Sequence, residues 1–127
     1  SGTTHPITGR PYLVGGELHR ETVIPNLNIL TLDANLDVVV VGTLPKAKVF
    51  PGIKFVTNTQ LGVYAGETYD ENGYPLTDEV LVFDTETGTV QNIGKLQIKL
   101  KFPTMALLQS GYMFAGGGIV ENSNEIT

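Results

Sequence analysis

The sequence predicts an all-β protein, and two observations carry that prediction. Its apolar residues come in short runs that are rich in Val, Ile, Leu, Phe and Tyr, with almost no helical periodicity. Seven prolines and fifteen glycines interrupt these runs at close intervals, which leaves no room for a substantial helix except at residues 94–100. A chain of 127 residues has the usual length of one domain, so we first treat residues 1–127 as a single folded segment.

Each expected strand is an apolar run that is bounded by turn-forming residues. In chain order, the expected strands are Tyr12–Val14, Asn28–Leu32, Val38–Val41, Ile53–Thr57, Gly62–Ala65, Glu79–Phe83, Thr89–Ile93, Thr104–Leu108 and Tyr112–Ala115.

The chain repeats itself. Leu13-Val14-Gly15-Gly16-Glu17 aligns with Val63-Tyr64-Ala65-Gly66-Glu67 and with Met113-Phe114-Ala115-Gly116-Gly117, at a spacing of 50 residues. Leu32-Asp33 recurs as Phe83-Asp84 at 51 residues, and Phe50-Pro51 recurs as Phe102-Pro103 at 52. Landmarks in one order at one spacing indicate structural repeats. We place the repeat units at about residues 1–50, 51–102 and 103–127.

One period reads as a four-stranded antiparallel meander. In the second copy, a strand after Phe50-Pro51 turns at Asn58–Gln60 and returns to the small pair Ala65-Gly66. A polar loop at 67–77, with an Asn-Gly turn signal, leads to the third strand, and the turn at 84–88 leads to the fourth.

These landmarks resemble the kelch-repeat family. Val14-Gly15-Gly16 is similar to the family's apolar run ending in Gly-Gly, and Phe83-Asp84-Thr85-Glu86-Thr87 is similar to its turn motif. The chain departs from the pattern where Ala65 and Ala115 replace a glycine, and where Val39 and Val90 stand in place of the family's Trp. The resemblance implies blades of a β-propeller and a non-catalytic protein-interaction function.

A closed propeller needs about four to eight blades, and this chain supplies about two and a half. We therefore expect an incomplete propeller: a segment whose ring is completed by the rest of a longer polypeptide, by other chains or by copies of itself. Such a segment exposes open sheet edges and flat apolar faces. The expected partners are a protein or the remaining blades.

The repeated small pairs have two interpretations. Gly-rich turns can cradle phosphate, but no helix follows these and no Lys-Ser/Thr completes a phosphate-binding loop. We favour a structural function, in which glycine lets the chain turn and lets strands approach closely. The structural glycines are Gly15, Gly16, Gly66, Gly116 and Gly117.

Binding residues are sought in loops, where propellers place them. The two longest loops, at 16–27 and 66–77, fall at equivalent positions in successive periods and hold the Tyr and Arg side chains typical of interfaces. The candidate binding residues are Glu17, His19, Arg20, Glu67, Tyr69, Asp70 and Tyr74.

Charge and composition argue against several classes of partner and of functional site. A net charge of −5 argues against nucleic acid and anionic membrane as partners, and no apolar run approaches the ~20 residues of a membrane-spanning helix. The absence of Cys removes thiolate metal sites and a Cys nucleophile. We expect no cofactor and no metal, although Asp70-Glu71-Asn72-Gly73 resembles a fragment of a calcium loop. Asp33, Asp37 and Asp84 look like turn-capping residues.

Two functions remain open. A binding or scaffold module is favoured, because no nucleophile–base pair or cofactor motif is visible. The alternative is a fragment of a carbohydrate-processing propeller enzyme. Such an enzyme would bind its sugar partly through arginines, and this chain has only two, Arg10 and Arg20. His5 and His19 are expected to be solvated. The sequence leaves the cellular compartment open.

Overall fold

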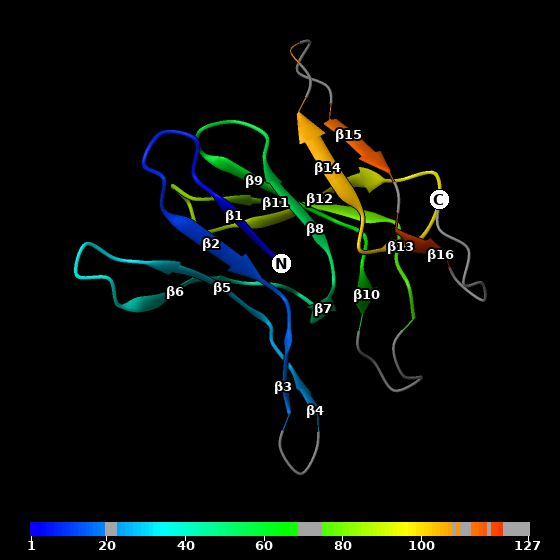
Figure 1. The fold of residues 1–127 in the computed structure, drawn as a ribbon, viewed down its shortest axis with the longest axis horizontal. Coiled ribbons are helices and arrows are strands. Elements are labelled where there is room, and N and C mark those ends of the chain that lie inside the picture. Colours follow the sequence, from blue (N-terminus) through cyan, green and yellow to red (C-terminus); the bar gives the residue numbers. More distant parts are fainter. Residues whose placement is uncertain (20–22, 69–74, 108, 110–112, 117, 121–127) are drawn as a thin grey trace.

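The computed structural model of the chain describes residues 1–19, 23–68, 75–107, 109, 113–116 and 118–120. All regular structure in these ranges is β-strand, which confirms the predicted fold class (Figure 1). No helix that could cross a membrane occurs in the described part of the chain.

The first period folds into a four-stranded antiparallel sheet, here called sheet 1, whose strands lie in chain order. The strands are β1 (Gly2–Thr4), β2 (Pro11–Val14), β5 (Asn28–Leu32) and β6 (Val38–Thr43).

The second period forms sheet 2 in the same way, so the predicted meander is confirmed in both periods. Its strands are β8 (Gly52–Phe55), β9 (Gln60–Tyr64), β11 (Glu79–Asp84) and β12 (Val90–Lys95). In the third period, β14 (Thr104–Leu107) pairs with β15 (Met113–Gly116).

The two sheets match in their irregularities as well as in their strands. The ladder between β5 and β6 shifts register at Ile29/Leu30, and the ladder between β11 and β12 shifts at the corresponding Val80/Leu81. Ile29 and Val80, the residues just before these shifts, face Gly42 and Gly94. A β-bulge bends a strand and increases its twist, so both sheets are bent at the same place.

The turns that lead to the last strand of each sheet are capped by aspartate, as the sequence predicts. Asp33 Oδ1 accepts hydrogen bonds from the N–H groups of Asn35 (2.8 Å) and Asp37 (3.0 Å). Asp84 Oδ1 accepts them from Glu86 (2.8 Å) and Thr87 (3.1 Å). Both carboxylates are therefore committed to holding a turn.

Seven of the described strands, β1 and six that form three additional pairs, were not predicted, because each is only two or three residues long and carries no alternation. The structure also corrects the possible helix at residues 94–100, where β12 ends and an irregular segment follows. The additional pairs are β3 (Glu17–His19) with β4 (Val23–Pro25), β7 (Lys48–Val49) with β10 (Glu67–Thr68), and β13 (Leu100–Lys101) with β16 (Ile119–Val120).

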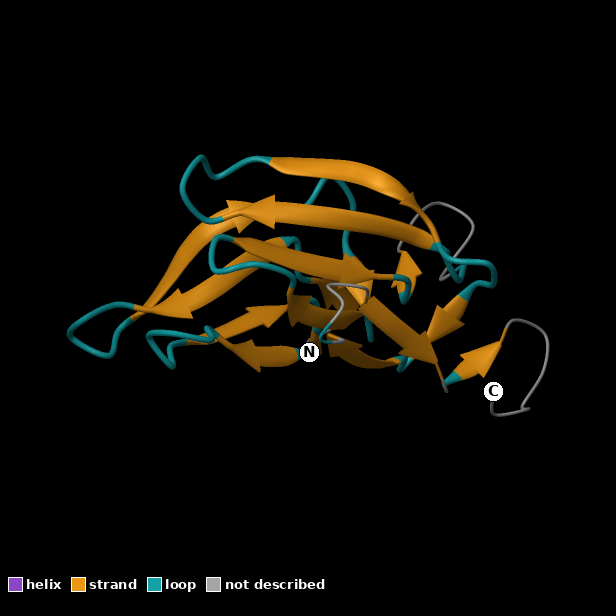
Figure 2. Cartoon of the chain, turned by 90° about the horizontal axis from the view of Figure 1, so that it is seen from above, coloured by secondary structure: helices purple, strands orange, loops and turns teal. Residues whose placement is uncertain are grey.

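The main core lies between the two sheets, which stack face to face (Figure 2). Sheet 1 contributes the face that carries Tyr12, Val14 and Ile29, here called the Tyr12 face. Sheet 2 contributes its Val63 face, whose core residues are Ile53, Phe55, Leu61, Val63, Leu81 and Phe83.

The stacking continues into the third period on the other side of sheet 2. A methyl group added at Gly52 would lie 2.8 Å from Met105 Cγ and 2.7 Å from Pro103 Cγ, so β8 and β14 are in close contact. The first strand of each period, β1, β8 and β14, lies beside its neighbour near the middle of the molecule (Figure 1). Three successive periods are thus stacked in chain order.

A buried lysine joins β7 to sheet 2. The Lys48 side chain is fully buried, and its Nζ lies 3.0 Å from Glu79 Oε1 and donates to the carbonyl oxygen of Ala65 at 3.3 Å. Burial lowers the pKa of Lys48 below its ordinary value, and the hydrogen bond and charge of Glu79 oppose that change. Leu100, which occupies the equivalent place two residues before Phe102, is buried without any charge.

We predict opposite outcomes for two substitutions at this pair. E79Q leaves the buried ammonium without its acid, and we expect a loss of roughly 3 kcal/mol in the free energy of unfolding. K48L removes the charge and installs the side chain used at position 100, so its stability should stay within about 1 kcal/mol of the parent. Urea denaturation measures the free energy of unfolding of both variants. An equal loss in the two would show that Glu79 does not stabilise the buried charge of Lys48.

Candidate functional site

Two of the repeated glycines, Gly15 and Gly66, lie against residues 48–51, the connection through which the chain passes from sheet 1 to sheet 2. A methyl group at Gly15 would lie 2.5 Å from the carbonyl oxygen of Lys48, and one at Gly66 would lie 2.9 Å from that of Val49. The connection at 48–51 is therefore held between two glycines, with backbone against backbone. Gly15, Gly16 and Gly66 also have φ values of 81°, 95° and 91°, which favour glycine. Phosphate binding is not needed to explain them.

In the third period the close contact is made by a different glycine from those predicted. Gly118, with φ 86°, is the residue whose added methyl group would meet the carbonyl oxygen of Lys101. Gly116 ends β15, and Gly117 lies outside the described residues. The interval from Pro103 to Gly116 is two residues shorter than that from Pro51 to Gly66, which accounts for the displacement.

The two expected binding loops begin as paired strands. Glu17 and His19 lie at the ends of β3, which pairs with β4 in a narrow ribbon that projects away from sheet 1 (Figure 1). Arg20 falls outside the described residues, as do Tyr69, Asp70 and Tyr74 and the calcium-like run at 70–73. The structure therefore brings none of these candidates together in a described site.

Glu67 is part of the framework. It lies on β10, is 9% exposed, and its Oε1 is 2.8 Å from Lys101 Nζ. Because this ion pair links the second period to the connection that leads into the third, the carboxylate already has a partner. The sequence placed Glu67 in a loop because β10 is too short to leave a pattern.

His5 is held in place, contrary to the expectation that it is solvated. Its Nδ1 accepts hydrogen bonds from the N–H groups of Ile7 and Thr8, both at 3.1 Å, so its Nε2 carries the proton and donates to the carbonyl oxygen of Asn58 at 2.6 Å. The imidazole also lies edge-on to Phe55, with ring centroids 4.9 Å apart. His5 thus fastens the β1–β2 loop to the β8–β9 turn.

The most unusual surface is the other side of sheet 1. Leu13, Val38 and Val40 are 49%, 63% and 56% exposed, although all three lie in β-strands of a four-stranded sheet. Leu30 pairs with Leu13 on one side and Val40 on the other, and Leu32 pairs with Val38, so these side chains share one face. We call this the Leu13 face, made of Leu13, Leu30, Leu32, Val38 and Val40.

Sheet 2 shows what this face resembles. By strand register, Leu13 corresponds to Val63, Leu30 to Leu81 and Leu32 to Phe83. In sheet 2 these three residues are at most 2% exposed, because sheet 1 covers them. The Leu13 face therefore has the composition of a buried face, and no sheet formed by the described residues covers it.

Sequence reasoning expected exposed apolar faces in general but did not identify these residues. The available signal was the uninterrupted run Val38–Val41, because a strand with one solvated face alternates apolar and polar residues. A strand that is apolar at every position is typical of a sheet covered on both sides.

A metal site is not found in the part of the chain that the structure describes. Within the described residues, no group of three or more His, Asp or Glu side chains could hold a metal ion.

No family model matches the sequence, and no curated protein is similar to it.

We predict that methyl groups at two neighbouring glycines have unequal effects. G15A places a methyl group against the Lys48 carbonyl in addition to the backbone strain, whereas G16A meets open space. The strain alone costs about 1–2 kcal/mol, so G16A should lose no more than that and G15A clearly more. Thermal and urea unfolding measure the stability of both variants. Equal losses of stability would show that the close contact between Gly15 and residues 48–51 does not contribute to stability.

Proposed function

We propose that the chain is a segment of a kelch-like β-propeller that acts as a non-catalytic interaction or scaffold module. In this proposal the Leu13 face binds another sheet of the same repeat type. In a longer polypeptide that sheet belongs to a neighbouring blade, and in the isolated chain it belongs to a second copy.

The stacking of the three periods supports the propeller arrangement. A propeller sets four-stranded antiparallel sheets face to face around an axis, with the first strand of each sheet innermost. The two complete sheets are meanders of this kind, and β1, β8 and β14 lie next to one another.

The observation that carries the proposal is the equivalence of the Leu13 face to a covered face. The residues of sheet 2 that correspond to Leu13, Leu30 and Leu32 are buried against the Tyr12 face of sheet 1. They are Val63, Leu81 and Phe83. The same kind of surface should therefore cover the Leu13 face. Burying a Val or Leu side chain fully contributes about 1.5–3 kcal/mol, so a face of five such residues favours association.

The loops remain proposed contact sites for a protein partner. The β3–β4 ribbon extends beyond the stacked sheets, and the segment 66–77 begins at the equivalent place in the next period. Glu17, His19, Arg20, Tyr69, Asp70 and Tyr74 are the proposed contact residues; Glu67 is omitted because it pairs with Lys101.

Self-association of the isolated chain tests the role of the Leu13 face. We expect the parent chain to associate as its concentration rises, and V40K to associate at least about tenfold more weakly, because it puts a charge into the buried interface. I93K is the matched control, since Ile93 is 60% exposed on a strand of sheet 2.

Sedimentation velocity over a range of concentrations gives the result. The proposal fails if the parent chain is a monomer throughout. It also fails if I93K weakens association as much as V40K does, because the effect would then be one of general surface apolarity.

A further inference from the structure

A groove runs along β8 between β1 and β14. It contains two adjacent hollows of about 300 Å³ and about 390 Å³, and Thr3 and Lys54 line both. Prolines 51 and 103 lie in one hollow, and Phe55 and Leu107 lie in the other. The groove is therefore built by all three periods, and Lys54 lines both of its hollows.

Lys54 is not required by the repeat. Counted from the Phe-Pro landmark, the equivalent residue of the third period is Ala106, and strand register gives Thr3 as the equivalent in the first. The inner strands therefore accept small side chains here. A long cationic side chain at only one of the three positions calls for an explanation other than packing.

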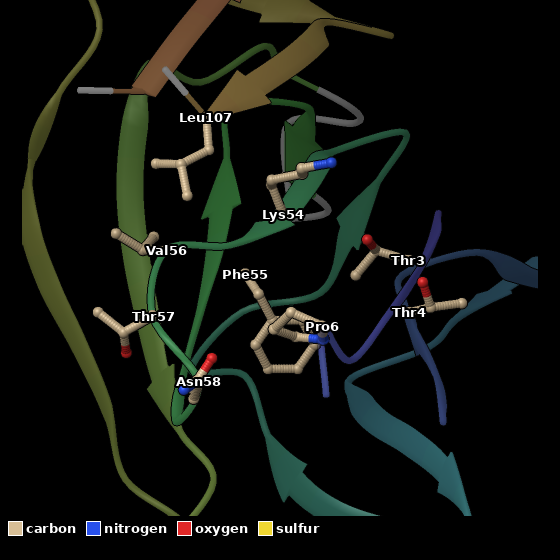
Figure 3. Close-up of a pocket in the computed structure, with 9 residues that line it drawn as sticks. All are labelled: Thr3, Thr4, Pro6, Lys54, Phe55, Val56, Thr57, Asn58 and Leu107. Atoms are coloured by element: carbon tan, nitrogen blue, oxygen red, sulfur yellow. The ribbon is translucent and has the colours of Figure 1, made fainter. Parts of the chain in front are cut away.

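The surroundings of Lys54 suit a negatively charged group. The residues that line the two hollows include no Asp or Glu, and neither ion pair between described residues, Lys48–Glu79 or Lys101–Glu67, involves Lys54. Figure 3 shows Lys54 between Leu107 on one side and Thr3 on the other, so a hydroxyl and an exposed apolar side chain flank it.

The walls of the 300 Å³ hollow are fixed in advance. His5 donates to the Asn58 carbonyl at 2.6 Å and accepts from the N–H groups of Ile7 and Thr8, so the β1–β2 loop and the β8–β9 turn are tied together. Phe55 is 5% exposed beneath them, whereas Leu107 is 41% exposed. A preformed hollow of this size, mostly apolar with one charged group, matches the general character of small-ligand sites.

We propose that this groove binds a small monocarboxylate with an apolar body. The carboxylate pairs with Lys54 Nζ and accepts a hydrogen bond from the Thr3 hydroxyl. The apolar body lies against the exposed side chain of Leu107. A single charge pair with modest apolar contact gives a dissociation constant on the order of 0.1–1 mM. The site uses no residue of the Leu13 face, so it stands independently of the proposed assembly.

Titration of the isotope-labelled chain with phenylacetate, followed by NMR, tests the proposal. We expect saturable shifts of the Lys54 side chain, the Thr3 amide and the Leu107 methyl groups. Phenylacetamide has the same shape without the charge, and acetate has the charge without the body. Each should bind at least about tenfold more weakly than phenylacetate.

Two variants complete the experiment. K54M keeps the length of the side chain and removes its charge, so we expect binding to fall at least about tenfold. K46M removes the charge of an exposed lysine away from the groove and should bind as the parent does. Thermal unfolding establishes that both variants are folded, and Lys54→Gln, which also removes the charge, replaces K54M if K54M does not fold. Lys54→Arg keeps the charge and should retain most of the binding.

Three results would overturn the assignment. One is that the NMR chemical shifts of the groove residues do not change at about 10 mM phenylacetate, well above the expected dissociation constant. Another is equal binding by K54M and the parent chain, or a loss of binding in Lys54→Arg as large as the loss in K54M. The third is equal binding of acetate and phenylacetate, which would reduce the site to a lysine that attracts any anion.

Discussion

The architecture depends on one constraint: each sheet carries apolar side chains on both faces and needs a neighbour on both. Sheet 2 meets this requirement, since sheet 1 covers its Val63 face and β14 lies against Gly52 on the other face. Sheet 1 meets it only on the Tyr12 face. A four-stranded sheet with a single covered face is common when the other face is polar, but here Val38 and Val40 are apolar and exposed.

Close stacking of the sheets also explains the unusual backbone between them. Phe50 and Phe102 occupy the same place in successive connections, with φ values of 57° and 55°, and their ring centroids lie 4.2 Å apart. Positive φ strains a bulky residue, so both connections hold a conformation that only surrounding contacts can maintain. Gly15 and Gly66 supply those contacts by admitting the backbone of residues 48–51. The repeated landmarks of the sequence are thus the residues that let one sheet follow another.

The sequence predicted the long strands well because the residues that form them are contiguous. Apolar runs between turns placed β5 at its observed bounds and β2, β9 and β11 within one or two residues, and the aspartates of the turns were recognised by type. The short strands β7 and β10 were missed, because Lys48 pairs with Thr68 across a distance in sequence that no local pattern encodes.

The same limit applied to individual side chains. Glu67 looked like a loop residue and His5 like a solvated one, because their partners, Lys101 and Asn58, are remote in sequence. Lys54 was not recognised for a similar reason: the groove around it is made by residues from three periods. Periodicity predicts which residues share a face, whereas the exposure of that face depends on what the fold sets against it.

The central claim is that the Leu13 face is a packing surface for another sheet. Its most direct test is the solvent exposure of the Leu13, Val38 and Val40 methyl groups, measured by NMR relaxation with a soluble gadolinium chelate at increasing chain concentration. The account predicts that these methyl groups become protected as the concentration rises, while those of Leu36, 76% exposed in the turn after β5, do not. Methyl groups of the Leu13 face that stay as exposed as those of Leu36 at every concentration would contradict it.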